Sequence, residues 1–273
     1  MTLNCNSKII EFNNKKIIGI LNVSNDSFYD GGNYNNIESA INRVSEMINE
    51  GADIIDLGAV SSKPGSEIIN GLEELKIVSK YIDEISFNYK KTLFSIDTYN
   101  SEVAEYALKK GFAIINDISA GKYDKRLFEV VKDYNAGYVL MHMKGDPNNM
   151  QVSPEYSNIY NNVYDFFKKK IEILNENGIN NIIIDPGFGF GKTIDHNFVL
   201  LKRLNDFKVF NRPILVGLSR KSMIYNFLNL TPNEALNGTT SLNTIALEKG
   251  ANILRVHDVK EANECIKLYN KLH

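Results

Sequence analysis

Cysteine is scarce in this chain: only Cys5, near the start, and Cys265, near the end, occur among 273 residues. Two cysteines so far apart do not make a disulfide framework, and no metal cluster can be built on them. Their scarcity predicts a reducing compartment, and we expect the protein to be cytoplasmic.

Long apolar runs and an excess of one charge are also missing. The first eight residues, MTLNCNSK, lack the apolar core of a signal peptide, and no run approaches the roughly 20 residues that span a bilayer. The 31 Lys and Arg residues are balanced by 33 Asp and Glu residues, which gives a net charge of −2. This balance gives no general reason to expect nucleic acid, whose phosphates favour a basic stripe. We therefore expect neither a membrane nor a nucleic-acid partner, and an anionic ligand must be bound locally.

Short apolar runs alternate with segments of helical spacing along the whole chain. The runs of strand length cover residues 16–21, 53–57, 92–96, 113–115, 137–141, 181–184, 213–218 and 252–256. The helical segments include residues 37–49, 72–85, 102–109, 127–134, 159–174 and 233–247. Continuous apolar runs are typical of parallel strands that are buried on both faces. Glycines such as Gly51 and Gly137 lie where a helix is expected to end, and glycine suits a left-handed C-cap.

Eight such units predict an α/β fold, a (β/α)8 TIM barrel, with residues 1–273 as a single domain. The alternative is an open doubly wound sheet, which also alternates strands and helices. Polar residues after nearly every strand favour the closed barrel, because closure collects the strand ends at one rim.

The apolar runs end at polar residues of different chemistry: Asn22, Asp56, Asp97, Asn116, His142, Asp185 and Arg255, together with the segment SRKS at residues 219–222. Asp97, Asn116 and Asp185 offer two carboxylates and an amide. A planar heterocycle with amino and ring N–H donors needs acceptors of this type. Lys221 would add a cation for a carbonyl oxygen. Taken singly, each Asp is also typical of a helix cap or a turn.

Arg255 and His257 are two residues apart at the end of the last strand, so both side chains point the same way. This pair predicts an anion clamp, since barrel phosphate sites often use the loops after strands seven and eight. The alternative is a salt bridge from Arg255 to Asp258 or another acid. The ordinary pKa of histidine, near 6.5, would make His257 pH-sensitive.

The glycine-rich segment GFGFGKT at residues 187–193 matches neither common nucleotide motif. Pro186 stands where the phosphate loop needs glycine, and Lys192 replaces the last glycine of the dinucleotide fingerprint. The flanking Phe188 and Phe190 would instead shape the rim or contact a ring. His142, a lone histidine between two methionines, is expected to be structural.

Several of these segments together resemble dihydropteroate synthase. They are GILNVSNDSFYDGG (19–32), SIDT (95–98), INDI (115–118), MHM (141–143), DPGFGFGK (185–192), SRKS (219–222) and RVHDV (255–259). The family is a (β/α)8 barrel, usually a homodimer, that condenses 6-hydroxymethyl-7,8-dihydropterin pyrophosphate with p-aminobenzoate. The resemblance implies dihydropteroate and pyrophosphate as products, Mg²⁺ as the cofactor, and a place in folate synthesis as a sulfonamide target.

Site residues carry over from the family by position. Asp97, Asn116, Asp185 and Lys221 match its pterin-binding residues, Asn22 its Mg²⁺-linked residue, and Arg255 and His257 its pyrophosphate clamp. Phe28, Pro64, Phe190 and Ser222 match positions around the p-aminobenzoate pocket. The resemblance implies that Lys221, Arg255 and His257 act in catalysis, and that the loops after strands one and two close over the site.

The second loop departs from the family pattern. Ser62 and Lys63 stand where the family usually has Thr-Arg, within the segment VSSKPG that begins at Val60. Ser24 and Asn25 likewise replace the usual Thr-Pro. Two other functions remain open: a methyltransferase barrel that binds pterins, which shares the Asp, Asn and Asp pattern at the strand ends, and a non-catalytic pterin-binding or scaffold protein, which the altered second loop makes conceivable.

Overall fold

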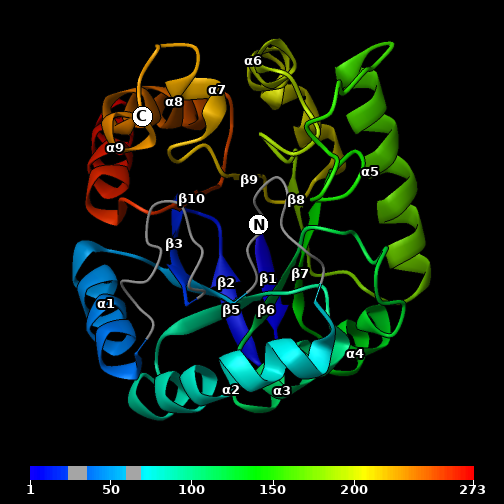
Figure 1. Cartoon of the computed structure of the whole chain (residues 1–273), viewed down its shortest axis with the longest axis vertical. Coiled ribbons are helices and arrows are strands. Elements are labelled where there is room, and N and C mark those ends of the chain that lie inside the picture. The colour runs from blue at the N-terminus through cyan, green and yellow to red at the C-terminus, as the bar shows by residue number, and fades with distance from the viewer. Residues whose placement is uncertain (24–35, 60–68) are drawn as a thin grey trace.

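The computed structural model describes residues 1–23, 36–59 and 69–273. In these residues, eight parallel strands form one sheet in the order β8-β7-β6-β5-β4-β3-β10-β9, and helices surround the strands (Figure 1). The strands are β3 (Lys16–Asn22), β4 (Ile54–Gly58), β5 (Leu93–Asp97), β6 (Ile114–Asp117), β7 (Gly137–Met141), β8 (Ile182–Asp185), β9 (Leu215–Val216) and β10 (Ile253–Val256). A parallel bridge between Ile184 and Ile214 joins the two edges of the sheet. The predicted barrel is confirmed.

Helices follow the strands in nearly every unit. They are α1 (Ile37–Glu50), α2 (Gly71–Asn88), α3 (Ser101–Lys109), α4 (Leu127–Asp133), α5 (Ile159–Glu176), α6 (Ile194–Lys202), α7 (Ser222–Tyr225), α8 (Leu236–Glu248) and α9 (Val259–Leu272), with 3-10 turns η1 (Leu204–Phe210) and η2 (Pro232–Glu234). Asparagine side chains cap three of them: Asn36 on α1, Asn70 on α2 and Asn158 on α5 each accept a backbone N–H of the first turn. No helix in the described part of the chain is long and apolar enough to cross a membrane.

The N-terminal residues form a hairpin that the sequence did not predict. Strand β1 (Thr2–Cys5) pairs antiparallel with β2 (Lys8–Glu11). Leu3, Ile10 and Phe12 from this segment are buried in one cluster with inward side chains of the barrel strands, such as Ile18 and Ile183. The hairpin therefore closes the N-terminal end of the barrel and leaves the opposite end for a site.

Three expectations about local structure need correction. The helix expected over residues 233–247 begins at Leu236, because Thr231 and Glu234 cap a separate 3-10 turn over Pro232–Glu234. The seventh strand, expected over residues 213–218, has ladder pairing only at Leu215–Val216 before the chain turns toward Lys221. Gly137 is not a helix cap but the first residue of β7. The left-handed position before it belongs to Asn135, with φ 47°.

The register of the sheet aligns the polar strand ends. Asn22 pairs with Gly58, Gly58 with Asp97, and Asp97 with Asn116, so these residues lie in one row at the C-terminal rim. On the other side of the barrel, Asp185 pairs with Met141. Since this rim is where barrel enzymes place their active sites, it is the candidate site.

Candidate active site at the C-terminal rim

Arg255 connects three strands at the rim. Its Nε donates to Asp56 Oδ2 at 2.7 Å, and its Nη2 donates to Asp97 Oδ2 at 2.7 Å. The same Asp56 oxygen accepts from Asn116 Nδ2 at 2.9 Å. Asp56 is 0% exposed, so this network is built into the barrel and does not belong to its surface. It brings together Arg255, Asp97 and Asn116, which were predicted as site residues.

The alternative prediction for Arg255 was a salt bridge to Asp258 or another acid. Asp258 pairs instead with Arg220, through two hydrogen bonds of 2.9 Å each. The acids bound to Arg255 are Asp56 and Asp97. Arg255 therefore forms salt bridges, but with acids of the rim and not with Asp258.

The guanidinium of Arg255 bonds two carboxylates, that of Asp56, which is fully buried, and that of Asp97, whose side chain is partly exposed. Burial raises the pKa of Asp97 to about 7, and the carboxylates of Asp56, Glu74 and Asp117 add to the rise, while Arg255 opposes it. The protonated form of Asp97 is therefore favoured more strongly than in an ordinary aspartate.

Asp185 and Lys221 make the second part of the site. Burial raises the pKa of Asp185, and the cation of Lys221 is the largest opposing influence. Gly187 N–H donates to Asp185 Oδ1 at 2.7 Å and orients the carboxylate. Lys221 donates to the carbonyl of Phe188 and lies 4.7 Å from the centre of the Phe190 ring. Burial lowers the pKa of Lys221 to about 8.

The glycine-rich segment is a tight turn and not a phosphate loop. The ammonium of Lys192 is directed at backbone carbonyls, those of His142, Gly187 and Phe190, at 2.8–3.1 Å. A lysine held in this way is not available to a phosphate. The rejection of the nucleotide motifs therefore agrees with the structure, and Phe190 is placed beside Lys221.

His257 lies next to Arg255 but in a different electrostatic state from the one expected. Its Nδ1 is 3.1 Å from Ser219 Oγ, and its backbone N–H also donates to that oxygen. Burial lowers the pKa of His257 to about 3, with a further contribution from Arg255. This lowered pKa runs against the expectation of titration near pH 6.5, because burial and nearby cations disfavour the protonated ring.

The predicted metal residue, Asn22, ends β3 beside a glycine of β4. A Cβ added to Gly58 would lie 3.3 Å from both Asn22 Oδ1 and Asp97 Cβ, so the small residue keeps these side chains close. In the described part of the chain there is no group of three or more His, Cys, Asp or Glu side chains that could hold a metal. Mg²⁺, however, commonly takes one or two protein oxygens and completes its shell with water and substrate phosphates. One amide oxygen at this rim fits that pattern.

Ser222 is placed at the first residue of the short helix α7, directly after Lys221. Four other predicted site residues, Phe28, Ser62, Lys63 and Pro64, lie outside the described residues. The chain after the second of these gaps is anchored at the rim: Ile69 N–H donates to Tyr99 Oη at 3.1 Å, and Asn100 Nδ2 donates to the carbonyl of Ile69.

Sequence reasoning left several residues of the rim without a role. Asp56 was noted as a strand end but not as the partner of Arg255, Ser219 was noted only as part of its motif, and Arg43 was not noted. Arg43 Nη2 donates to the carbonyl of His257 at 2.8 Å. No local signal in the sequence points to such pairs. The expectation that His142 is structural agrees with its burial and its edge-on packing against Phe166.

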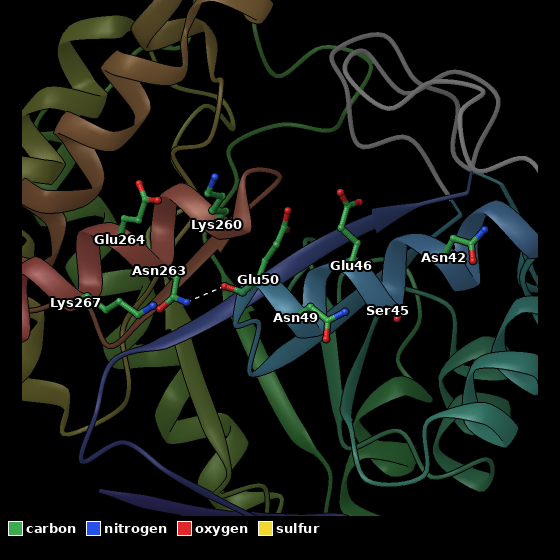
Figure 2. Close-up of a pocket in the computed structure, with 9 residues that line it drawn as sticks. All are labelled: Asn42, Ser45, Glu46, Asn49, Glu50, Lys260, Asn263, Glu264 and Lys267. Carbon is green, nitrogen blue, oxygen red and sulfur yellow. Dashed lines mark hydrogen bonds between the residues drawn. The ribbon is translucent and has the colours of Figure 1, made fainter.

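A groove of about 650 Å³ lies elsewhere, between α1 and α9, and Figure 2 shows the side chains that line it. They are Asn42, Ser45, Glu46, Asn49, Glu50, Lys260, Asn263, Glu264 and Lys267. All are polar, and Asn263 of α9 bonds to α1 by donating to the carbonyl of Glu50 at 2.7 Å. Arg43 links this groove to the rim, because it pairs with both Glu46 and Glu50 while contacting His257. The groove lies outside the barrel and holds none of the rim residues.

Known proteins resemble this chain along most of its length. The model of the family described as "Pterin binding enzyme" matches residues 18–257. Dihydropteroate synthase of Escherichia coli (strain K12) is 40% identical over 261 residues, which cover 95% of this chain and 92% of the relative. The structure of Yersinia pestis dihydropteroate synthase with a sulfonamide drug has 36% identity and a TM-score of 0.95, covering 100% of this chain and 98% of that one. The Thermus thermophilus enzyme in complex with 4-aminobenzoate has 32% identity and a TM-score of 0.89, and the match covers 100% of both chains. The chain therefore belongs to the dihydropteroate synthase family of pterin-binding enzymes.

Proposed function

We propose that this protein condenses 6-hydroxymethyl-7,8-dihydropterin pyrophosphate with p-aminobenzoate, giving 7,8-dihydropteroate and pyrophosphate. The observation that carries the proposal is the placing of two carboxylates, the partly buried Asp97 and the buried Asp185, and the amide of Asn116 at the same rim as Lys221 and Arg255. The first three match the donors of a pterin ring, and the two cations match a carbonyl oxygen and an anionic leaving group.

The hydrogen-bond acceptors of the pterin subsite would select for the donor pattern of the ring, because they lie in a largely buried site. Asp97 and Asp185 accept N–H groups of the ring, and Asn116 supplies both a donor and an acceptor. Because an unmatched buried polar group costs about 1–3 kcal/mol, a ring with a different donor pattern would bind weakly. Lys221 would donate to the ring carbonyl, and Phe190 and Ser222 would border the neighbouring p-aminobenzoate.

The pyrophosphate would be bound by the part of the Arg255 guanidinium that Asp56 and Asp97 do not engage. Among the described residues, the carboxylates of Asp56 and Asp97 engage Nε and Nη2, so Nη1 would serve the oxyanion. The two carboxylates fix the plane of the guanidinium before substrate arrives, and such preorganised charge is the main way a site without a nucleophile accelerates departure of a leaving group. His257 would donate a further hydrogen bond from its neutral ring.

Mg²⁺ is part of the proposal, with Asn22 as its protein ligand. The ion would supply charge neutralisation for the pyrophosphate oxygens. The remaining coordination would come from the substrate and from water, in keeping with a single amide oxygen at this point of the rim.

We also propose that residues 1–273 act as one domain and that the protein is a homodimer. Exposed apolar side chains on neighbouring elements support the dimer: Val199 on α6, and Phe227, Leu228 and Leu230 after α7. Light scattering on the wild type and on Phe227→Glu tests it, since a charge within a dimer interface should release monomers. A cytoplasmic location is supported by the two free, buried cysteines, Cys5 and Cys265.

The reaction itself is tested by measuring pyrophosphate release with both substrates present, with each alone, and with the unphosphorylated pterin alcohol. Release that requires both substrates supports the synthase. A methyltransferase barrel or a non-catalytic pterin-binding protein would bind a pterin and release no pyrophosphate. Sulfonamides, which the Yersinia pestis enzyme binds, should compete with p-aminobenzoate in the same assay.

A further inference from the structure

A buried lysine lies beneath the rim in a position that the proposed reaction does not use. Lys192 is only 3% exposed, and its Nζ donates to the carbonyls of Gly187 at 2.8 Å, Phe190 at 2.9 Å and His142 at 3.1 Å. A neutral amine has two N–H donors, whereas an ammonium has three. The three acceptors therefore indicate that Lys192 is held in its charged form, although burial pulls its pKa well below the usual range.

These three contacts join two separate segments of the barrel. Gly187 and Phe190 are the ends of one turn, closed by a hydrogen bond of 3.1 Å from Phe190 N–H to the carbonyl of Gly187. His142 directly follows β7. Gly187 has φ +68°, and a Cβ added there would lie 2.0 Å from the carbonyl oxygen of His142, so the turn is packed tightly against the end of β7. Lys192 fastens the two segments together.

The fastened turn carries contacts to two residues of the pterin subsite. The N–H of Gly187 orients the carboxylate of Asp185, and the carbonyl of Phe188 accepts the ammonium of Lys221. The ring of Phe190 lies 4.7 Å from Lys221 Nζ. A movement of this turn would therefore displace both the acceptor and the cation that face the ring.

We propose that Lys192 is a positioning residue for the pterin subsite: by holding the 187–190 turn against the end of β7, it sets the carboxylate of Asp185 and the ammonium of Lys221 at the separation that the ring requires. The inference rests on the proposed function, since it concerns the same subsite. Its ammonium also acts on Asp185 as a nearby positive charge, alongside Lys221 and Arg255.

A second residue, Asn197, also holds this turn but carries no charge. Comparing it with Lys192 therefore separates the effect of holding the turn in place from the effect of the positive charge on Asp185. Asn197, on α6 and 2% exposed, accepts from Gly189 N–H at 2.8 Å and has no charge. Lys15 provides a matched control far from the rim. Its Nζ donates to the carbonyl of Ala251 at 2.7 Å, at the N-terminal ends of β3 and β10.

The test compares Lys192→Met, Asn197→Ala and Lys15→Met with the wild type by calorimetric titration of the pterin alcohol between pH 5 and 9, together with steady-state kinetics. We expect Lys192→Met to weaken pterin binding by about tenfold or more, with a larger effect on KM than on kcat. Asp185 loses a neighbouring cation in this variant. The midpoint of the acid limb of binding should therefore rise, because the pKa of Asp185 is no longer lowered by this cation.

Asn197→Ala should weaken pterin binding without moving that midpoint, and Lys15→Met should leave both unchanged. Unaltered pterin affinity in both Lys192→Met and Asn197→Ala would overturn the inference, and so would an equal loss in Lys15→Met. If near-ultraviolet circular dichroism shows that Lys192→Met does not fold, Asn197→Ala decides alone: wild-type affinity then refutes the role of the turn. A wild type that binds no pterin would instead refute the proposed function.

Discussion

Replacing Asp97 by asparagine should stabilise the substrate-free protein at pH 8 while removing most of its pterin affinity. In the folded protein, burial raises the pKa of Asp97 from 3.8 to about 7, even though Arg255 is bound to it. A carboxyl group with a raised folded-state pKa stabilises the fold below its unfolded pKa, and this contribution is lost as the pH rises through the folded value. The free energy of unfolding should therefore fall between about pH 4 and 7.

The size of the effect follows from the shift. A rise of about three units at about 1.36 kcal/mol per unit sets an upper bound of about 4 kcal/mol on the cost of ionised Asp97. The opposing effect of Arg255 is already contained in that shift, and asparagine keeps an oxygen that can accept from Arg255 Nη2, while the bond to Asp56 remains. Because the side chain of Asp97 is partly exposed, solvent reduces the cost of its charge below the bound, and we expect a net gain of roughly 1–2 kcal/mol at pH 8, or several degrees in Tm.

The assay is thermal and urea unfolding of the wild type and Asp97→Asn at pH 5 and pH 8, with pterin binding measured by calorimetry. The wild type should lose stability between these two pH values, and the variant should lose less. Asp206→Asn, which changes an acid in an exposed pair with Arg203, is the control. Equal destabilisation of Asp97→Asn at both pH values would refute the reasoning, since it would mean that the ion pair with Arg255 outweighs the cost of burial.

Three further outcomes are expected. Asp185→Asn should reduce pterin affinity about tenfold or more with the fold intact, because one acceptor of a buried carboxyl becomes a donor; unchanged affinity by calorimetry would remove Asp185 from the site. Arg255→Lys, which keeps the charge but loses the planar fork between Asp56 and Asp97, should weaken binding of the pterin pyrophosphate more than binding of the alcohol. Equal losses for the two ligands would make Arg255 structural. Lys63→Arg, in a segment outside the described residues, should lower the KM for p-aminobenzoate, because arginine can bond two acceptors at once; no change in KM or kcat would make the substitution in that loop neutral.

Much of the fold could be predicted because parallel strands that are buried on both faces consist of consecutive apolar residues, which are recognisable in the sequence. The runs at residues 53–57 and 92–96 are within one residue of β4 and β5 at each end. Prediction was poorer where pairing depends on neighbours that are distant in the sequence. Pro213 to Leu218 is apolar throughout, yet its ladder pairing ends after two residues because the chain must turn to place Lys221. The hairpin β1-β2 was not predicted, because a strand of four residues shows at most two repeats of the alternation between buried and exposed residues.

The candidate site shows the same division. The sequence by itself determined which polar residues end the strands, and the barrel then requires Asp97, Asn116, Asp185 and Arg255 to meet at one rim. Only the tertiary structure decided how they are paired and charged. Arg255 bonds Asp56 from 199 residues away, and no local pattern records such a contact.

The tertiary structure also decided the pKa of His257 and the role of Lys192, which the sequence did not indicate. Burial and nearby cations lower the pKa of His257, and Lys192 holds a turn in place because three carbonyls converge on its ammonium. Burial and the field of neighbouring charges arise only when the strands close into a barrel. The sequence therefore determined the fold and the membership of the rim, whereas protonation and orientation within the rim were decided by packing.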